Sequence, residues 1–273
     1  MIDLHVHTWR CRHAEGAAED YVRTAAERGV RTLAFTEHLP LPPALAMNVP
    51  VAEGYAMPAG ELPEYVAEVH AAASVGAGIG VEVLLGVECD VVPAGIDYAR
   101  EAIAQYPYDL VLGSVHFIDD WAFDDPDRAT RYGEWRIDEL WERYFGDVIA
   151  AAKSGVADVM AHADLVKKFC HRPDGPVDHL YVSAAEALRQ AGLAVEVNTS
   201  GLRKPCRELY PAQDFLVELR RAGVPVTVGS DAHTPADVGA GGAEAVSALR
   251  GAGYRSVLVF RGRVAEEVGL DDL

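Results

Sequence analysis

Nine side chains of the types that bind transition metals lie at the ends of short apolar runs or in the loops that follow them. They are His5, His7, His13, His38, Glu88, His116, His162, Asp231 and His233. Imidazole and carboxylate are common ligands of zinc, manganese and iron. One ion takes about four protein ligands, so this set suits two or three neighbouring ions that share a carboxylate. Such centres polarise a phosphoryl oxygen and supply hydroxide at neutral pH.

The spacing of the first two histidines supports a shared ion. His5 and His7 are two residues apart, so a regular strand places both imidazoles on one face. His13 lies in a predicted loop that can fold back toward them. A single histidine at a strand end is more often an ordinary core or surface residue. However, six of the seven main apolar runs end in a candidate ligand, which makes chance placement a poor explanation. The remaining histidines (His70, His171 and His179) are interpreted as surface residues, of which His171 could line the mouth of a site.

The elements that must position these side chains alternate between strands and helices. Apolar runs predict strands at 2–6, 30–36, 81–87, 110–115, 157–161, 193–197 and 224–229, and a last run at 256–260 either closes the sheet or lies outside it. Helical stretches are predicted at 17–28, 62–73 and 132–153. This alternation is typical of a β/α barrel, whose active site lies at the carboxyl ends of the strands. A proline-rich segment follows His38 and is long enough to be a functional loop, for instance a lid; its prolines are Pro40, Pro42, Pro43, Pro50 and Pro58.

Composition narrows the class of protein. The 273 residues suit one barrel domain spanning 1–273, and the 50% hydrophobic and 24% charged residues are those of a globular chain. A net charge of −18 disfavours nucleic acid as a partner. No apolar run is long enough for a membrane span, and the first residues do not resemble an export signal, so a cytoplasmic location is expected. Free thiols are expected at Cys11, Cys89, Cys170 and Cys206, with Cys11 and Cys89 as either thiolate ligands or, more in keeping with the histidines present, wall residues.

Seven stretches of the sequence resemble the polymerase-and-histidinol-phosphatase (PHP) superfamily, and most closely its histidinol-phosphatases. They are His5-Val6-His7-Thr8, Cys11-Arg12-His13, Thr36-Glu37-His38, Gly86-Val87-Glu88, Gly113-Ser114-Val115-His116-Phe117, Ala161-His162-Ala163-Asp164 and Gly229-Ser230-Asp231-Ala232-His233. The similarity to histidinol-phosphatases extends over 113–123, 165–168 and 198–204. The resemblance implies a distorted seven-stranded (β/α)7 TIM-like barrel with three divalent ions, zinc or else manganese or iron.

The resemblance also implies how the ligands divide. His5, His7, Glu88 and Asp231 would hold the first ion, Glu88 would bridge to a second ion held by His116 and His162, and His13, His38 and His233 would hold the third. Glu37 would orient an imidazole. The expected reaction is hydrolysis of L-histidinol phosphate to L-histidinol and phosphate, in histidine biosynthesis, by attack of a metal-bound hydroxide on phosphorus. Asp231, His233 and Glu88 are the expected catalytic residues, with Asp231 or a nearby histidine as the acid for the leaving oxygen.

The sequence indicates the residues that would bind a small phosphate monoester less clearly than it indicates the metal ligands. Arg203 could clamp phosphate or be an ordinary surface arginine, and Lys168 is a weaker candidate. Asn198 could orient Arg203 or a metal-bound water, or cap a turn. An acidic loop (Asp119, Asp120, Asp124 and Asp125) could attract a cationic substrate or be merely solvated, and Trp121 and Phe123 within it could stack on an imidazole or pack in the core.

Three other functions remain compatible with these residues. A phosphoesterase of the same superfamily could act on nucleotides or other small phosphate esters. A metal-dependent amidohydrolase or deaminase could use a similar barrel, although no lysine ends a predicted strand to supply the carboxylated lysine typical of those enzymes. A non-catalytic metal store would need no substrate site at all.

Overall fold

Seven parallel strands form the centre of the computed structural model, which describes residues 1–48 and 54–273. They are β1 (Ile2–Val6), β2 (Thr32–His38), β3 (Glu82–Asp90), β4 (Leu110–Ser114), β7 (Val159–Met160), β8 (Ala194–Asn198) and β9 (Val226–Gly229). The strands are hydrogen-bonded in the order in which they occur along the chain. Beyond β9 the chain returns to β1, where the His7 amide donates to the Ala232 carbonyl at 2.9 Å. The predicted distorted seven-stranded barrel is therefore confirmed.

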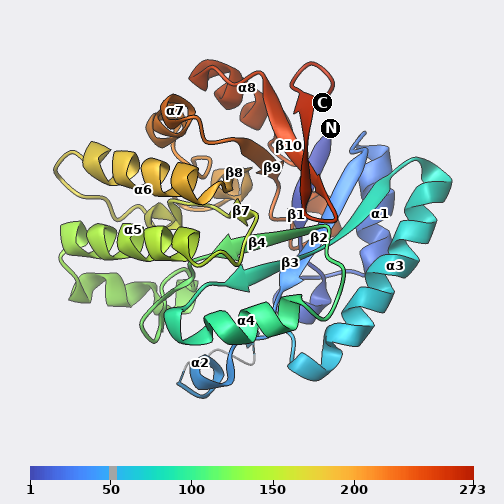
Figure 1. Ribbon diagram of the computed structural model, residues 1–273, viewed down its shortest axis with the longest axis horizontal. Coiled ribbons are helices and arrows are strands. Elements are labelled where there is room, and N and C mark those ends of the chain that lie inside the picture. Colours follow the sequence, from blue (N-terminus) through green and yellow to red (C-terminus); the bar gives the residue numbers. More distant parts are fainter. Residues whose placement is uncertain (49–53) are drawn as a thin grey trace.

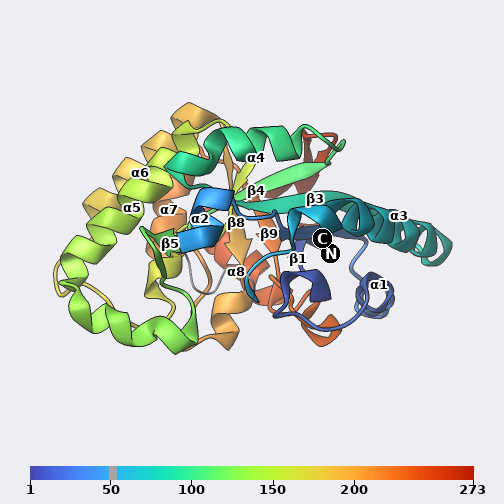
Figure 2. The same ribbon diagram turned by 90° about the horizontal axis from the view of Figure 1, so that it is seen from below.

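Helices surround the strands (Figure 1). They are α1 (Ala18–Glu27), α3 (Leu62–Ile79), α4 (Ile96–Ile103), α5 (Ile137–Lys153), α6 (Asp178–Ala191), α7 (Gln213–Ala222) and α8 (Gly242–Ala252). Figure 2 shows α5, α6 and α7 on one side of the strands and α1 and α3 on the other. In α1, Tyr21, Val22 and Ala25 are fully buried, and burial of each large apolar side chain contributes roughly 1.5–3 kcal/mol. No helix among the described residues is both long and apolar enough to cross a membrane.

Two strands that carry candidate ligands extend further toward their carboxyl ends than the sequence predicts. The strand predicted at 30–36 occupies Thr32–His38, and the one predicted at 81–87 occupies Glu82–Asp90. Glu37, His38 and Glu88 are therefore strand residues with extended backbone, rather than loop residues just beyond a strand. The reason is that a polar side chain facing a metal-binding cavity is buried just as an apolar one is, so polarity does not end the strand here.

The helix predicted at 132–153 begins five residues too early. Residues Pro126–Glu134 form a 3-10 segment whose first turn is capped by the Asp125 carboxylate, and the α-helix starts only at Ile137. Between the two, Trp135 and Arg136 have extended backbone. Aromatic residues continue through this break at helix-like spacing, although Gly133, a poor helix former, lies two residues before it.

Two hairpins and the segment after His38 add further elements to the barrel. The last predicted strand, β10 (Ser256–Arg261), pairs in antiparallel fashion with β11 (Val264–Gly269) and lies outside the barrel sheet. A second short hairpin joins β5 (Phe117–Ile118) to β6 (Trp121–Ala122). The proline-rich segment after His38 contains helix α2 (Pro43–Asn48) and a 3-10 turn at Ala59–Glu61, whereas Pro50 lies outside the described residues.

Candidate metal centre

Two imidazoles and two carboxylates converge at the carboxyl end of β1. His5 Nε2 lies 3.0 Å from His7 Nε2, and Glu88 Oε2 lies 3.3 Å from the first and 3.5 Å from the second nitrogen. Asp231 Oδ1 lies 3.4 Å from His7 Nε2. His5, His7 and Glu88 are at most 1% exposed. These four atoms surround one point, as the ligand atoms of a single tetrahedral ion do.

The opposite ring nitrogens of both histidines contact further carboxylates. His5 Nδ1 lies 2.7 Å from Glu196 Oε1 on β8, and His7 Nδ1 lies 3.2 Å from Glu37 Oε1 on β2. The Thr8 hydroxyl donates to the other Glu37 oxygen at 2.6 Å, which fixes that carboxylate. A proton held on each Nδ1 by these acceptors leaves the Nε2 lone pairs directed at the shared point. Such carboxylate–histidine pairs are a regular feature of metal sites.

A second group of ligand atoms shares Glu88. His162 Nε2 lies 3.0 Å from Glu88 Oε1, His116 Nε2 lies 3.6 Å from the same oxygen, and the two nitrogens are 3.2 Å apart. His116 Nδ1 contacts Asp90 Oδ1 at 2.9 Å. Glu88 thus presents one oxygen to each group, which is the geometry of a bridging carboxylate.

The third group lies nearest to solvent. One ligand atom from each of His13, His38 and His233 lies within 4.8 Å of the others. The carbonyl oxygens of Cys11 and Gly54 lie 2.8 and 3.2 Å from His13 Nδ1, and the Asp231 carbonyl lies 3.0 Å from His233 Nδ1. As in the first group, an acceptor occupies one nitrogen of the His13 ring and of the His233 ring and leaves the other for a ligand, whereas His38 Nδ1 has no hydrogen-bond partner among the described residues.

The electrostatics of the three groups call for added positive charge. Burial alone would raise the pKa of Glu88, but the His38 and His5 imidazoles outweigh it and hold that pKa well below its ordinary range. Burial likewise opposes protonation of His5, yet Glu196 and Glu88 raise its pKa well above the ordinary value. Within the described residues, His38 Nδ1, His162 Nδ1 and Asp90 Oδ2 are buried without a hydrogen-bond partner. Ionised carboxylates beside orphaned nitrogens and oxygens fit a metal centre better than a self-sufficient polar network.

Two of the candidate ligands have unusual backbone. His162 has a φ of 27° and Asp231 a φ of 52°, in the left-handed region that L-residues rarely adopt. The cost of such a conformation is of the order of 1–3 kcal/mol and concentrates at functional sites. The His162 amide donates to Glu196 Oε2 at 3.1 Å, so the same carboxylate that contacts His5 also holds this backbone in place.

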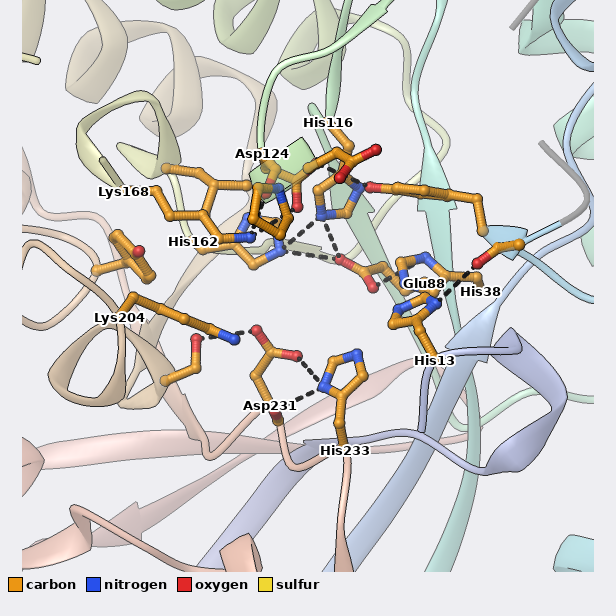
Figure 3. Close-up of a pocket in the computed structure, with 17 residues that line it drawn as sticks. His13, His38, Glu88, His116, Asp124, His162, Lys168, Lys204, Asp231 and His233 are labelled. Atoms are coloured by element: carbon orange, nitrogen blue, oxygen red, sulfur yellow. Dashed lines mark hydrogen bonds and ion pairs between the residues drawn. The ribbon is translucent and has the colours of Figure 1, made fainter. Parts of the chain in front are cut away.

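A cavity of about 520 Å³ opens above the three groups. Its wall includes Tyr55, Asp124, Lys168 and Lys204, which come from loops rather than strands (Figure 3). Lys168 Nζ donates to Asp124 Oδ2 at 3.1 Å and to the Asp124 carbonyl at 2.6 Å. Burial, followed by the nearby Lys168 cation, lowers the pKa of Lys204. The cavity thus combines an acidic, histidine-rich floor with cationic groups on its wall.

The residues predicted to bind phosphate lie at different distances from this cavity. Lys168 lines it. Asn198 is buried beneath it and donates to Glu196 Oε2 at 3.0 Å and to Asp231 Oδ2 at 3.3 Å. Arg203 donates to the Ser230 carbonyl at 2.7 Å and pairs with Asp237 at 3.4 Å, while its neighbour Lys204 is the one that lines the cavity.

The structure shows where the residues with two possible roles lie. Trp121 and Phe123 are fully buried and pack in the core rather than facing the cavity. The ring of His171 stacks on Tyr132, with centroids 4.4 Å apart, and His70 and His179 are exposed on α3 and α6. All four cysteines are free thiols, and burial raises the pKa of both Cys11 and Cys89.

Sequence reasoning missed Glu196 and Asp90, for which a signal existed. Each is an acid within an apolar strand, two residues from another polar residue (Asn198 and Glu88), so both members of each pair lie on one face. Tyr55 and Lys204 carried no comparable signal because they lie on irregular loops.

The PHP domain family matches residues 3–200. A probable histidinol-phosphatase of Deinococcus radiodurans is 38% identical over 96% of this chain and 97% of its own length. A histidinol-phosphatase of Bacillus subtilis is 27% identical over 87% of this chain and 95% of its own. The crystal structure of a Lactococcus lactis histidinol phosphate phosphatase, complexed with zinc, L-histidinol and phosphate, has the same fold, with a TM-score of 0.79, 20% identity and coverage of 97% of this chain and 98% of that one. The chain belongs to the PHP domain family.

Proposed function

We propose that the protein is a metal-dependent histidinol-phosphatase that hydrolyses L-histidinol phosphate to L-histidinol and phosphate. The convergence of nine ligand-type side chains on the cavity floor is the observation that carries this proposal. Support for the substrate comes from the Deinococcus radiodurans and Bacillus subtilis proteins, which match nearly along their whole lengths and bear that name. The single-domain organisation over 1–273 and the cytoplasmic location stay predictions.

We assign three divalent ions to the three groups of ligands described above. Zinc is the expected ion because the Lactococcus lactis protein is complexed with it, although manganese and iron accept the same ligands. When bound, the ions neutralise the phosphate oxygens and supply the hydroxide that attacks phosphorus. Glu88 joins the first two groups through its two oxygens.

The remaining residues of the chain orient ligands and bind phosphate. Asp231 Oδ2 accepts hydrogen bonds from the Ser200 hydroxyl at 3.0 Å and from Asn198, which leaves Oδ1 for the first ion. Lys168 and Lys204 would contact phosphate oxygens from the wall, since ammonium groups bind phosphate as point charges. The phosphate role of Arg203 stays a prediction, and its present contacts would allow it only an indirect part through Ser230 and Asp237.

Departure of the alkoxide requires a proton. Asp231 and His233 stay the proposed donors, and both line the cavity. Burial opposes ionisation of Asp231, but the His5 imidazole outweighs it and holds the pKa of the carboxyl well below its ordinary value. An Asp231 that is ionised in this way serves better as a ligand than as an acid. Burial and the nearby His7 imidazole lower the pKa of His233 well below its ordinary value, so the pKa shifts favour neither residue as the donor.

The test is phosphate release from L-histidinol phosphate beside nucleoside monophosphates and sugar phosphates, with the metal content of the same preparation. We expect a strong preference for L-histidinol phosphate and two to three ions per chain. His162→Ala should lose metal and activity together, whereas His70→Ala, on the exposed face of α3, should lose neither. Preference for another phosphate ester would make that ester the substrate in place of L-histidinol phosphate. A fully metallated protein without phosphatase activity would overturn the proposal.

A further inference from the structure

Asp124 is a carboxylate in the cavity that none of the three groups of metal ligands includes. It follows β6, lines the cavity, and lies beside Lys168 in Figure 3, with Lys204 and Asp231 on the other side of the opening. Burial alone would raise the pKa of Asp124, but Lys168 and His116 outweigh it and lower that pKa, so the carboxylate is ionised.

Only part of the acceptor capacity of Asp124 is used. Its Oδ1 accepts from the Tyr55 hydroxyl at 3.4 Å, and its Oδ2 accepts from Lys168 Nζ at 3.1 Å. An ionised carboxylate offers about four acceptor positions. The two remaining positions are available to a donor from a bound molecule, because Asp124 is part of the cavity lining.

The Asp124 carboxylate disfavours binding of a substrate that carries negative charge alone. A phosphate monoester carries negative charge at neutral pH, and a fixed carboxylate in the same partly dehydrated cavity repels it. The repulsion is offset when the ester also carries a cation close to the phosphate. L-histidinol phosphate is such a molecule, because its ammonium group is on the carbon next to the methylene that carries the phosphate.

We propose that Asp124, held by Tyr55, binds the ammonium group of the substrate and thereby selects amino-alkyl phosphates over other phosphate monoesters. This inference rests on the proposed phosphatase function. The phosphate would lie over the ions and toward Lys204, and the substituent would extend along the wall that carries Asp124 and Leu165.

A competing role for Asp124 is to position Lys168 for phosphate binding. The two roles differ in what they predict. Loss of a Lys168-positioning contact weakens every phosphate ester equally, since every ester carries the phosphate. Loss of an ammonium contact weakens only esters that carry the amine. A double-mutant-type cycle, in which Asp124 and the substrate amine are removed singly and together, separates these two roles.

The experiment compares kcat/KM for L-histidinol phosphate and for its deamino analogue, an imidazolylpropyl phosphate, in the wild-type protein and in Asp124→Asn. A charge-assisted hydrogen bond is expected to give the wild type a preference of about tenfold to a hundredfold for the amino ester. Asp124→Asn should remove most of that preference. Asp120→Asn is the matched control, because it changes the same charge at an exposed position outside the cavity, in the turn of the adjoining β5–β6 hairpin, and it should keep the preference.

The outcomes separate this inference from the proposed function. Equal losses on both esters in Asp124→Asn would assign the carboxylate to Lys168 and overturn the ammonium contact. A wild-type preference for the amino ester below about twofold would also overturn the ammonium contact. This comparison needs no variant, so it remains a test even if Asp124→Asn does not fold. If the wild type hydrolyses neither imidazole ester but does hydrolyse nucleotides, the proposed function fails first, which is a different result.

Discussion

The floor and the wall of the cavity are built from different structural elements, strand ends for the floor and loops for the wall. The floor consists of the nine ligand-type residues, most of them on strand ends and at least nine-tenths buried, and carboxylates hold the outer ring nitrogens of His5, His7 and His116. The wall residues Tyr55, Asp124, Lys168 and Lys204 lie on loops and, apart from Tyr55, are only partly buried. The contrast indicates that the floor determines the chemistry and the wall determines the substrate. Substitutions in the two regions should therefore differ in kind, with metal content lost from the floor and substrate affinity lost from the wall.

The largest effect is expected at the centre of the floor. Glu88→Ala removes the oxygens that serve two groups of ligands, so we expect loss of about two ions and a fall in kcat of about a thousandfold or more, since metal ions contribute several kcal/mol to the transition state. Metal analysis and steady-state kinetics on the same sample measure both. Glu101→Ala, an exposed glutamate on α4, is the control. A Glu88→Ala protein with full metal content would disprove the bridging role.

A smaller effect is expected one layer further out. Glu196→Gln weakens the contacts to His5 Nδ1 and to the His162 amide, which lie in separate ligand groups. Loss of such an outer partner typically lowers metal affinity or activity by about 10–100-fold. Competition with a chelator gives the affinity of the first and second ions. If only one ion is weakened, Glu196 does not couple the two groups.

On the wall, the sharpest comparison is between neighbours. Lys204→Ala should raise KM for phosphate esters about tenfold, the size of one charge-assisted hydrogen bond, at unchanged metal content. Arg203→Ala should raise it less, because its guanidinium is engaged by the Ser230 carbonyl and Asp237. A larger rise in KM for Arg203→Ala than for Lys204→Ala would assign the phosphate contact to Arg203.

The smallest expected effect is a pH dependence of the metal-free floor. Although burial works against protonation, neighbouring carboxylates raise the pKa of His7 to about 9 and that of His116 to about 10. The unfolded value is about 6.5. The extra protons therefore stabilise the folded state fully below about pH 6.5, and this stability is lost as the pH rises through about 9 to 10.

Calorimetry of the chelated protein measures this dependence. We expect its Tm to fall by a few degrees between about pH 6.5 and pH 10. The zinc-loaded protein is the control, because the ions replace those protons and should remove the fall over the same window. A constant Tm in the metal-free protein would mean that His7 and His116 are already neutral.

The barrel and the floor could be predicted from the sequence for the same reason. Strand ends of a parallel barrel meet at one face, so polar residues that end apolar runs must gather there. His5, Glu88 and His162 were found this way although they are far apart in the chain. The outer partner Glu196 was overlooked because Glu37 was the one imidazole acceptor considered beside the ligands.

The wall could not be predicted because its positions depend on loop conformation. Lys204 and Arg203 are adjacent in the sequence and chemically alike, and only the backbone of the 3-10 turn at Ser200–Arg203 decides which of them lines the cavity. Tyr55 reaches Asp124 from a segment with no periodic pattern. The break before α5, by contrast, had a sequence signal in Gly133, whose low helix propensity precedes the extended Trp135 and Arg136.

The closure of the barrel has a consequence for chain entropy. Asp3 on β1 accepts a hydrogen bond from the amide of Ser230, which is 227 residues away in the sequence, and the neighbouring His5, His7 and Asp231 form one ligand group. An ion held there closes most of the chain into a ring. In the chain-entropy account, a cross-link that closes a loop of about 100 residues contributes roughly 4.7 kcal/mol, and the contribution grows only slowly with longer loops. An ion at this place would thus act on the unfolded state much as a disulfide between the two ends of the barrel would.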